Sequence, residues 1–154
     1  LFDGVTAVDQ MLSTLSPYLA NTDSVAVYHT DGKNGNKLPA DFCLNTTGSY
    51  VVSVMRDRTD GQEYLVVVNK SFRKEMTADF TVVGNSLDLS AVMDITSGTP
   101  TALKKNGNGF SLSLKAGGLA VLQFPQGYSS SRSRPKRRQE SSPRLRCLGI
   151  IFCR

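Results

Sequence analysis

The stretch Tyr50-Val-Val-Ser-Val-Met-Arg-Asp-Arg-Thr-Asp-Gly-Gln-Glu-Tyr-Leu-Val-Val-Val68 predicts the fold more clearly than any other part of the chain. Two runs rich in β-branched and aromatic residues flank a polar segment that contains Asp60-Gly61. This dipeptide favours a hairpin turn, because glycine accepts the positive φ that such turns require. We therefore expect two antiparallel strands, 50–55 and 63–68, joined by a turn at 56–62.

Further short strands are predicted on both sides of this hairpin, because apolar or alternating runs recur about every ten residues between turn signals. Residues 76–83 alternate, with Ala78, Phe80 and Val82 on one face, which is typical of a strand with one buried side. The other expected strands are 24–30, 42–44, 91–95, 101–103, 110–114 and 119–124. About eight short strands indicate a mainly β fold, a sandwich or barrel rather than a parallel sheet, and we expect an antiparallel β-sandwich.

Before the first strand, residues 1–22 are predicted to form a helix. Its apolar residues recur at helical spacing and make one stripe: Val5, Val8, Met11, Leu12, Leu15 and Leu19. Pro17 lacks the N–H that a helix interior requires, so the helix is expected to end near Leu15. We divide the chain into this helix, which ends a preceding domain or packs on the sandwich, the β-sandwich at 23–126 and a disordered basic tail at 127–154.

The net charge of +5 is carried by the C-terminal tail. From Tyr128 onward eight basic residues face one acid, Glu140, a balance of +7, whereas the preceding 127 residues hold 10 basic and 12 acidic residues, a balance of −2. The tail is low in complexity and is expected to be disordered. Its candidate contacts to nucleic-acid phosphates are Arg132, Arg134, Lys136, Arg137 and Arg138. The alternatives are a solvated tail or residues read from another frame, and the mildly acidic body gives no reason to expect a nucleic-acid partner.

Several kinds of site are not expected from the composition. No glycine-rich phosphate-binding motif occurs, and no cofactor is predicted. No apolar run approaches the length of about 20 residues that a membrane-spanning helix needs, so no membrane partner is predicted. Of the three cysteines, Cys43 lies in an apolar run and is expected to be a small buried hydrophobe. A disulfide between Cys147 and Cys153 is sterically conceivable.

The candidates for acid–base chemistry are few. The single histidine, His29, must belong to any Ser-His-Asp or Cys-His arrangement, but its place at a strand end favours a structural role. Asp57, Asp60 and Glu63 cluster around the hairpin turn. A glycosidase-like carboxylate pair needs a cleft and a fixed separation, so we interpret these three as solvated turn residues. No catalytic residue is predicted.

Two binding sites remain as hypotheses. Asp31, Asn34, Asn36 and Asp41 could suggest a calcium loop, but they lack EF-hand spacing and a closing glutamate, which favours a plain mobile loop and no metal. A carbohydrate platform needs exposed aromatic rings, and the chain has no tryptophan. Its best candidates among the tyrosines are Tyr28, Tyr50 and Tyr64. Two triplets, Asn45-Thr-Thr47 and Asn69-Lys-Ser71, match the N-glycosylation acceptor pattern, which is common by chance.

Three segments together resemble the C-terminal part of glycoside hydrolases that pair a TIM barrel with β-sandwich domains, β-galactosidase-like enzymes among them. They are Ser24-Val-Ala-Val-Tyr-His-Thr30 with the following glycine-rich loop and Leu38-Pro39, then Glu63-Tyr-Leu-Val-Val-Val-Asn-Lys70, then Leu112-Ser-Leu-Lys-Ala-Gly-Gly-Leu-Ala-Val-Leu-Gln-Phe124. The resemblance covers residues 1–125. It implies that the helix is the last helix of the barrel and that the catalytic acids lie upstream of this sequence.

The resemblance therefore implies a non-catalytic accessory domain in carbohydrate degradation, with the catalytic barrel of the parent chain as its partner. A chain that begins with Leu1 suggests a fragment, and a polysaccharide-degrading parent would be secreted or periplasmic. Two other hypotheses stay open: a carbohydrate-binding module that recognises a polysaccharide, and a nucleic-acid-associated protein that acts through its basic tail.

Overall fold

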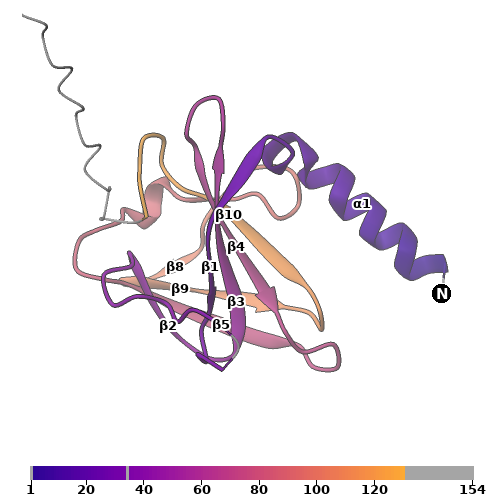
Figure 1. The fold of residues 1–154 in the computed structure, drawn as a ribbon, viewed down its shortest axis with the longest axis horizontal. Coiled ribbons are helices and arrows are strands. Elements are labelled where there is room, and N and C mark those ends of the chain that lie inside the picture. Colours follow the sequence, from indigo (N-terminus) through magenta and orange to yellow (C-terminus); the bar gives the residue numbers. More distant parts are fainter. Residues whose placement is uncertain (1, 34, 131–154) are drawn as a thin grey trace, which may run out of the picture.

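The computed structural model describes residues 2–33 and 35–130, and it is a two-sheet antiparallel sandwich preceded by one helix (Figure 1). The predicted fold class is confirmed. The expectations for residues 131–154, which include the pairing of Cys147 with Cys153 and the five basic candidates from Arg132 to Arg138, lie outside the described residues.

The first sheet has six strands in the order β1-β3-β4-β10-β6-β7, and the second has four in the order β2-β5-β9-β8. All described pairings are antiparallel. The strands of the first sheet are β1 (Thr22–His29), β3 (Tyr50–Asp57), β4 (Glu63–Asn69), β10 (Leu119–Gln123), β6 (Met93–Asp94) and β7 (Thr101–Ala102). Those of the second are β2 (Leu44–Thr47), β5 (Met76–Val82), β9 (Gly109–Leu114) and β8 (Lys105–Asn106).

The predicted hairpin is confirmed as β3 and β4, whose register runs from Tyr50 opposite Asn69 to Arg56 opposite Glu63. Gly61 has φ +75°, the left-handed conformation that a residue with a side chain rarely adopts. The backbone N–H of Asp57 donates to the carbonyl of Gln62 over 2.9 Å and closes the loop. The turn chemistry of Asp60-Gly61 therefore sets the pairing of the two central strands.

The core lies between the two sheets and is built from the alternate residues of their strands. Phe80 and Phe110 stack on neighbouring strands with ring centroids 5.0 Å apart, and Tyr50 packs beside Phe80. In β5 the inward residues are Ala78, Phe80 and Val82, as predicted from the alternation. Burial of this apolar surface is the main term that holds the sheets together.

Several details differ from the sequence-based expectations, and the strand expected at 42–44 is instead β2 at Leu44–Thr47. Helix α1 (Phe2–Leu19) includes Pro17 and does not end near Leu15, because the residues on either side of the proline are held by packing and by a bond from the N–H of Ala20 to the carbonyl of Ser16. Residues 91–95 begin with the end of a short 3-10 helix, η1 (Leu89–Ala91), and only Met93–Asp94 form a strand. The glycine-rich segment 104–109 contributes the short strand β8.

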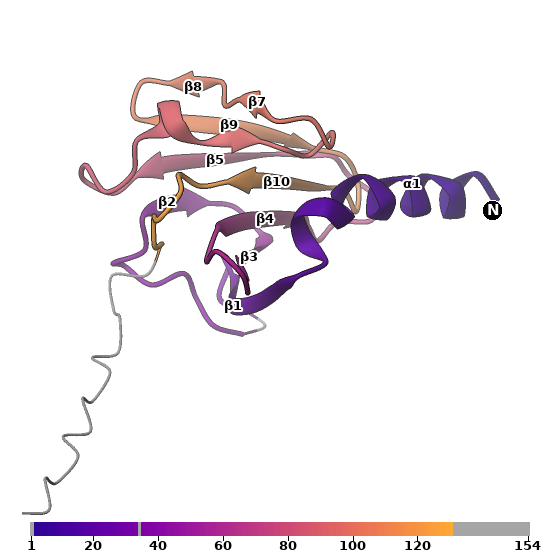
Figure 2. The ribbon, with the colours of Figure 1, turned by 90° about the horizontal axis from the view of Figure 1, so that it is seen from above.

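The outer faces of the two sheets differ in polarity. The four-stranded sheet exposes small polar residues on its outer face: Asn45, Thr47, Thr77, Asp79, Thr81, Ser111 and Ser113. The six-stranded sheet presents an apolar outer face, and α1 packs against it, with the N-terminal part of the helix running past the edge of the sheet (Figures 1 and 2). The outer face of one sheet is therefore a packing surface, and the outer face of the other is exposed to solvent.

Candidate functional site

The C-terminal half of α1 packs on the outer face of the six-stranded sheet. Leu15 is the central contact, with 4% of its surface exposed. It belongs to a cluster with Tyr64 of β4, Val121 of β10 and Ile95, which follows β6. The stripe of apolar residues predicted from helical spacing is thus a packing face over this half of the helix.

Two further contacts fix the direction of the helix. The hydroxyl of Tyr18 donates to the carbonyl of Gly98 over 3.0 Å, and its ring meets that of Tyr64 edge to face at 6.4 Å between centroids. A Cβ added at Gly98, whose φ is +82°, would come within 2.4 Å of the Cγ2 of Thr14, so only glycine allows this close approach. At the same end of the helix, the hydroxyl of Thr22 donates to the carbonyl of Leu19 over 2.8 Å. A two-residue connection follows α1, so the helix and β1 are rigidly coupled.

Part of this apolar face is left uncovered. Val27 of β1 is directly opposite Ser53, which in turn is opposite Val66, and residues opposite one another share a face of the sheet. Val27 is nevertheless 42% exposed, and Val25, at the bulge beside it, is 41% exposed. Leu12 on the helix is 59% exposed. These positions are candidate contacts for another body. Phe72, which is 89% exposed, and Val83 are exposed apolar residues elsewhere on the domain.

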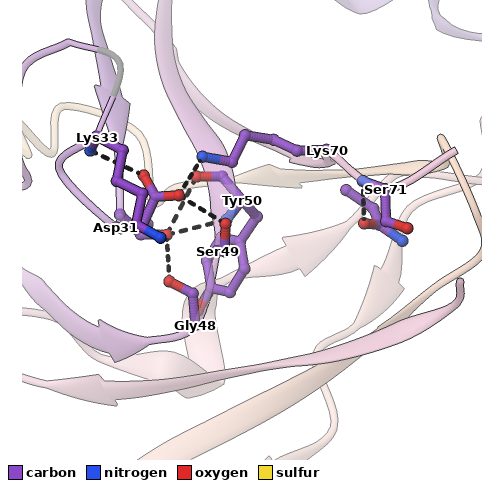
Figure 3. Close-up of polar contacts among 9 residues, drawn as sticks. Asp31, Lys33, Gly48, Ser49, Tyr50, Lys70 and Ser71 are labelled. Atoms are coloured by element: carbon purple, nitrogen blue, oxygen red, sulfur yellow. Dashed lines mark hydrogen bonds and ion pairs between the residues drawn. The ribbon is translucent and has the colours of Figure 1, made fainter.

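At one end of the sandwich, the loop after β1 is anchored by Asp31 (Figure 3). Its carboxylate accepts hydrogen bonds from the Nζ of Lys70 over 2.7 Å, the hydroxyl of Ser49 over 2.7 Å and the backbone N–H of Lys33 over 3.2 Å. The Lys70 ammonium, the Ser49 hydroxyl and this N–H hold the pKa of Asp31 well below its usual range. The cluster ties three separate parts of the chain together.

This anchor changes the interpretation of the loop as simply mobile. Asp31 joins the loop after β1 to Ser49, which precedes β3, and to Lys70, which follows β4, and spacing alone does not reveal these contacts. Among the described residues, no group of three or more metal-ligating side chains is assembled. The backbone carbonyl of Asn36 accepts a hydrogen bond from the N–H of His29 over 2.8 Å. Asn34, the other asparagine of the hypothetical calcium loop, lies outside the described residues.

The interpretation of Glu63 as a solvated turn residue is wrong. Its side chain is fully enclosed, forms an ion pair with Arg56 directly across the hairpin, and accepts the backbone N–H of Ser130 over 2.8 Å. The signal was present in the sequence, because the turn at Asp60-Gly61 sets a register that places position 56 opposite position 63. Asp57 and Asp60 remain in the turn, where their carboxylates accept backbone N–H groups of the same loop.

No family model, curated protein or solved structure matches this chain. Among the described helices, none is long and apolar enough to span a membrane.

Within residues 2–33 and 35–130, no acid–base site is assembled around His29. The residue lies at the end of β1, where a structural role was predicted, and its Nδ1 is buried without a hydrogen-bond partner in the described part of the chain. A Cβ at Gly35 would come within 2.8 Å of the Cδ2 of this ring. The imidazole is packed under its own loop rather than oriented toward a reactive group.

The three tyrosines proposed as a carbohydrate platform do not form one. Tyr50 is 0% exposed and belongs to the inter-sheet core, and Tyr64 is 6% exposed beneath the helix. Tyr28 is half-buried, edge to face with Phe42. Burial raises the pKa of all three phenols. The rings of Tyr50 and Tyr64 are therefore packing elements that are not exposed for stacking on a sugar.

The C-terminal boundary of the sandwich lies later than predicted. Tyr128 packs edge to face on Phe124, with centroids 5.2 Å apart, and Ser130 is buried. Residues 127–130 therefore belong to the packed body rather than to the tail. Beneath them lies Cys43, which is 3% exposed, as predicted for a small buried hydrophobe, and burial raises the pKa of its thiol to about 11.

Proposed function

We propose that this chain is a non-catalytic accessory domain of a glycoside hydrolase acting in carbohydrate degradation, and that it docks on the catalytic barrel of its parent. The observation that supports the proposal most directly is the fixed helix. The C-terminal half of α1 is held by Leu15 and Tyr18, while its N-terminal part runs past the sheet (Figure 2). A helix held in this way orients whatever is joined to it.

The resemblance in sequence agrees with this arrangement. The segment 112–124, which resembles the closing hairpin of glycosidase C-terminal domains, spans the end of β9 and β10. Strand β10 pairs with β4 at the centre of the six-stranded sheet, and Val121 on it lies under the helix. The uncovered apolar positions at Leu12, Val25 and Val27 would then face the barrel.

The experiment uses the barrel domain that the proposal places upstream of Leu1 in the same gene. The separately expressed barrel and this chain are mixed, and association is measured by isothermal titration calorimetry. Leu12→Glu is expected to weaken association without unfolding the domain, because Leu12 is exposed. The matched control is Gln10→Glu, which adds the same charge about 200° around the helix at another exposed position.

Two results would overturn the proposal. Coding DNA without a glycosidase barrel upstream of Leu1 would remove the parent. Cleavage of chromogenic glycosides by the purified chain alone would show that the domain itself is catalytic. If Leu12→Glu leaves association unchanged, the contact surface does not include Leu12.

A further inference from the structure

Two triplets in the chain match the acceptor pattern for N-linked glycans, Asn45-Thr-Thr47 and Asn69-Lys-Ser71. The pattern alone treats them as equal. The modification needs the amide nitrogen of the asparagine and the hydroxyl at the third position, and the folded domain must then hold a bulky, hydrophilic group at the surface. The structure separates the two triplets on each of these points.

Asn45 meets the requirements. It lies on β2, an edge strand of the four-stranded sheet, with its side chain on the polar outer face. Its Oδ1 accepts the backbone N–H of Thr46 over 2.8 Å, whereas its Nδ2 has no hydrogen-bond partner among residues 2–33 and 35–130. The hydroxyl of Thr47 is likewise unengaged within those ranges, and both residues are exposed. The folded domain therefore engages neither group, and a glycan on Nδ2 breaks no hydrogen bond among the described residues.

The surroundings of Asn45 also leave room for a sugar. Its cross-strand neighbour is Thr81, an exposed small residue, and Thr81 is opposite Gly109, which has no side chain. On the open side of β2, Asn45 lines a cleft of about 410 Å³ with Lys37, Leu38 and other residues of the preceding loop. A glycan attached at Nδ2 can extend over this polar face or into the cleft without displacing a core residue.

Asn69 meets none of the requirements for carrying a glycan in the folded domain. It is 1% exposed, and its Nδ2 donates to the carbonyl of Lys74 over 2.8 Å and to that of Lys115 over 2.9 Å. Its Oδ1 accepts the N–H of Ser71 over 2.9 Å, and the hydroxyl of Ser71 accepts the N–H of Lys74 over 3.0 Å. A glycan on this nitrogen would break the bonds that close the end of β4 and would expose buried polar groups.

We propose that Asn45 is an N-glycosylation site of the folded chain and that Asn69 is not. The donor is a lipid-linked oligosaccharide pyrophosphate. The Nδ2 of Asn45 forms a bond to C1 of the first sugar while the bond from C1 to the pyrophosphate oxygen breaks. The electron pair of the broken bond stays on the lipid pyrophosphate, which leaves, and the amide nitrogen releases one proton to solvent. Transfer occurs on the nascent chain, so both asparagines are reachable at that stage, but a chain modified at Asn69 cannot complete the fold.

The experiment expresses the full 154-residue chain behind a cleavable secretion leader in a glycosylating eukaryotic host. Intact mass is measured before and after treatment with peptide-N-glycosidase, and peptide mapping locates the asparagine that the enzyme converts to aspartate. Asn45→Gln and Thr47→Ala are expected to abolish the mass shift completely. Thr47→Ser, which keeps a hydroxyl at the third position, is the matched control and is expected to retain it.

Folding is checked by circular dichroism of the same secreted samples. If secretion is poor, translation into microsomes reports occupancy by a gel shift that endoglycosidase reverses. One glycan per folded chain, located at Asn45, supports the proposal. An unmodified Asn45 in the secreted or microsomal chain would overturn it, as would a glycan at Asn69 in protein with the native spectrum.

Discussion

Replacing Glu63 by glutamine removes a charge that the fold encloses completely. The Glu63 side chain is 0% exposed, and its carboxylate binds the guanidinium of Arg56 and the buried backbone N–H of Ser130. Glutamine has nearly the same shape, so the packing of β4 is preserved. The change therefore isolates the contribution of the charge to the attachment of the segment that follows Phe124.

The magnitude follows from the two contacts. A hydrogen bond to a charged group contributes about 1.5–3 kcal/mol, and a neutral one about 0.5–1.5 kcal/mol. The Arg56 side chain is 40% exposed, so its guanidinium regains water in the variant and the loss of the ion pair is discounted. We expect Glu63→Gln to lower the free energy of unfolding by about 2 kcal/mol, with the Ser130 bond as the larger part.

The assay is equilibrium unfolding in urea, followed by circular dichroism. A loss of this size moves the midpoint by roughly 1 M at the slopes usual for small domains. Glu75→Gln is the matched control, because Glu75 is exposed and such surface changes usually stay within about 0.5 kcal/mol. If Glu63→Gln is no more destabilising than Glu75→Gln, the carboxylate does not hold the C-terminal segment and the reasoning is refuted.

Three further predictions concern the helix, the thiol and the loop. Leu15→Ala is expected to cost about 2–5 kcal/mol in urea unfolding because Leu15 is 4% exposed, whereas Leu12→Ala at 59% exposure should cost far less; equal costs would contradict the docked helix. Cys43, whose pKa is raised to about 11, should resist thiol reagents at pH 8 until the chain unfolds, and mass mapping that finds it labelled in native protein would contradict its burial. The lowered pKa of Asp31 means that its contribution is present above about pH 3.9, the usual carboxyl value, and is lost as the pH falls below it; Asp31→Asn should flatten this part of the stability–pH curve, and an unchanged curve would contradict the anchor.

The β3–β4 hairpin could be predicted from sequence because its information is local. The turn at Asp60-Gly61 and the apolar runs beside it specify both the strands and their register, and the alternation in β5 specifies its buried face. The burial of Cys43 followed from the apolar run around it. In each of these cases the residues that decide the structure are neighbours in the chain.

The rest could not be predicted because its causes are distant in sequence. The pairing of Glu63 with Arg56 follows from the hairpin register, but the N–H that its carboxylate also accepts belongs to Ser130, 67 residues away, and no local pattern indicates that contact. Asp31 is held by Lys70 across 39 residues. The predicted helix end near Leu15 followed from the low helix propensity of Pro17, which the packing of Leu15 and Tyr18 overrides. Tyr50 and Tyr64 were assigned to the surface from residue type alone, although both lie on central strands.

Because the outer faces of the two sheets differ in polarity, a probe can distinguish one side of the sandwich from the other. On the outer face of the six-stranded sheet Val27 of β1 is 42% exposed, whereas the outer face of the four-stranded sheet, with Ser113 on it, carries small polar side chains. An environment-sensitive dye at position 27 would therefore change its emission when a partner binds this face, whereas the emission of the same dye at position 113 would not change. The orientation of the domain can thus be measured in solution without a structure of the complex.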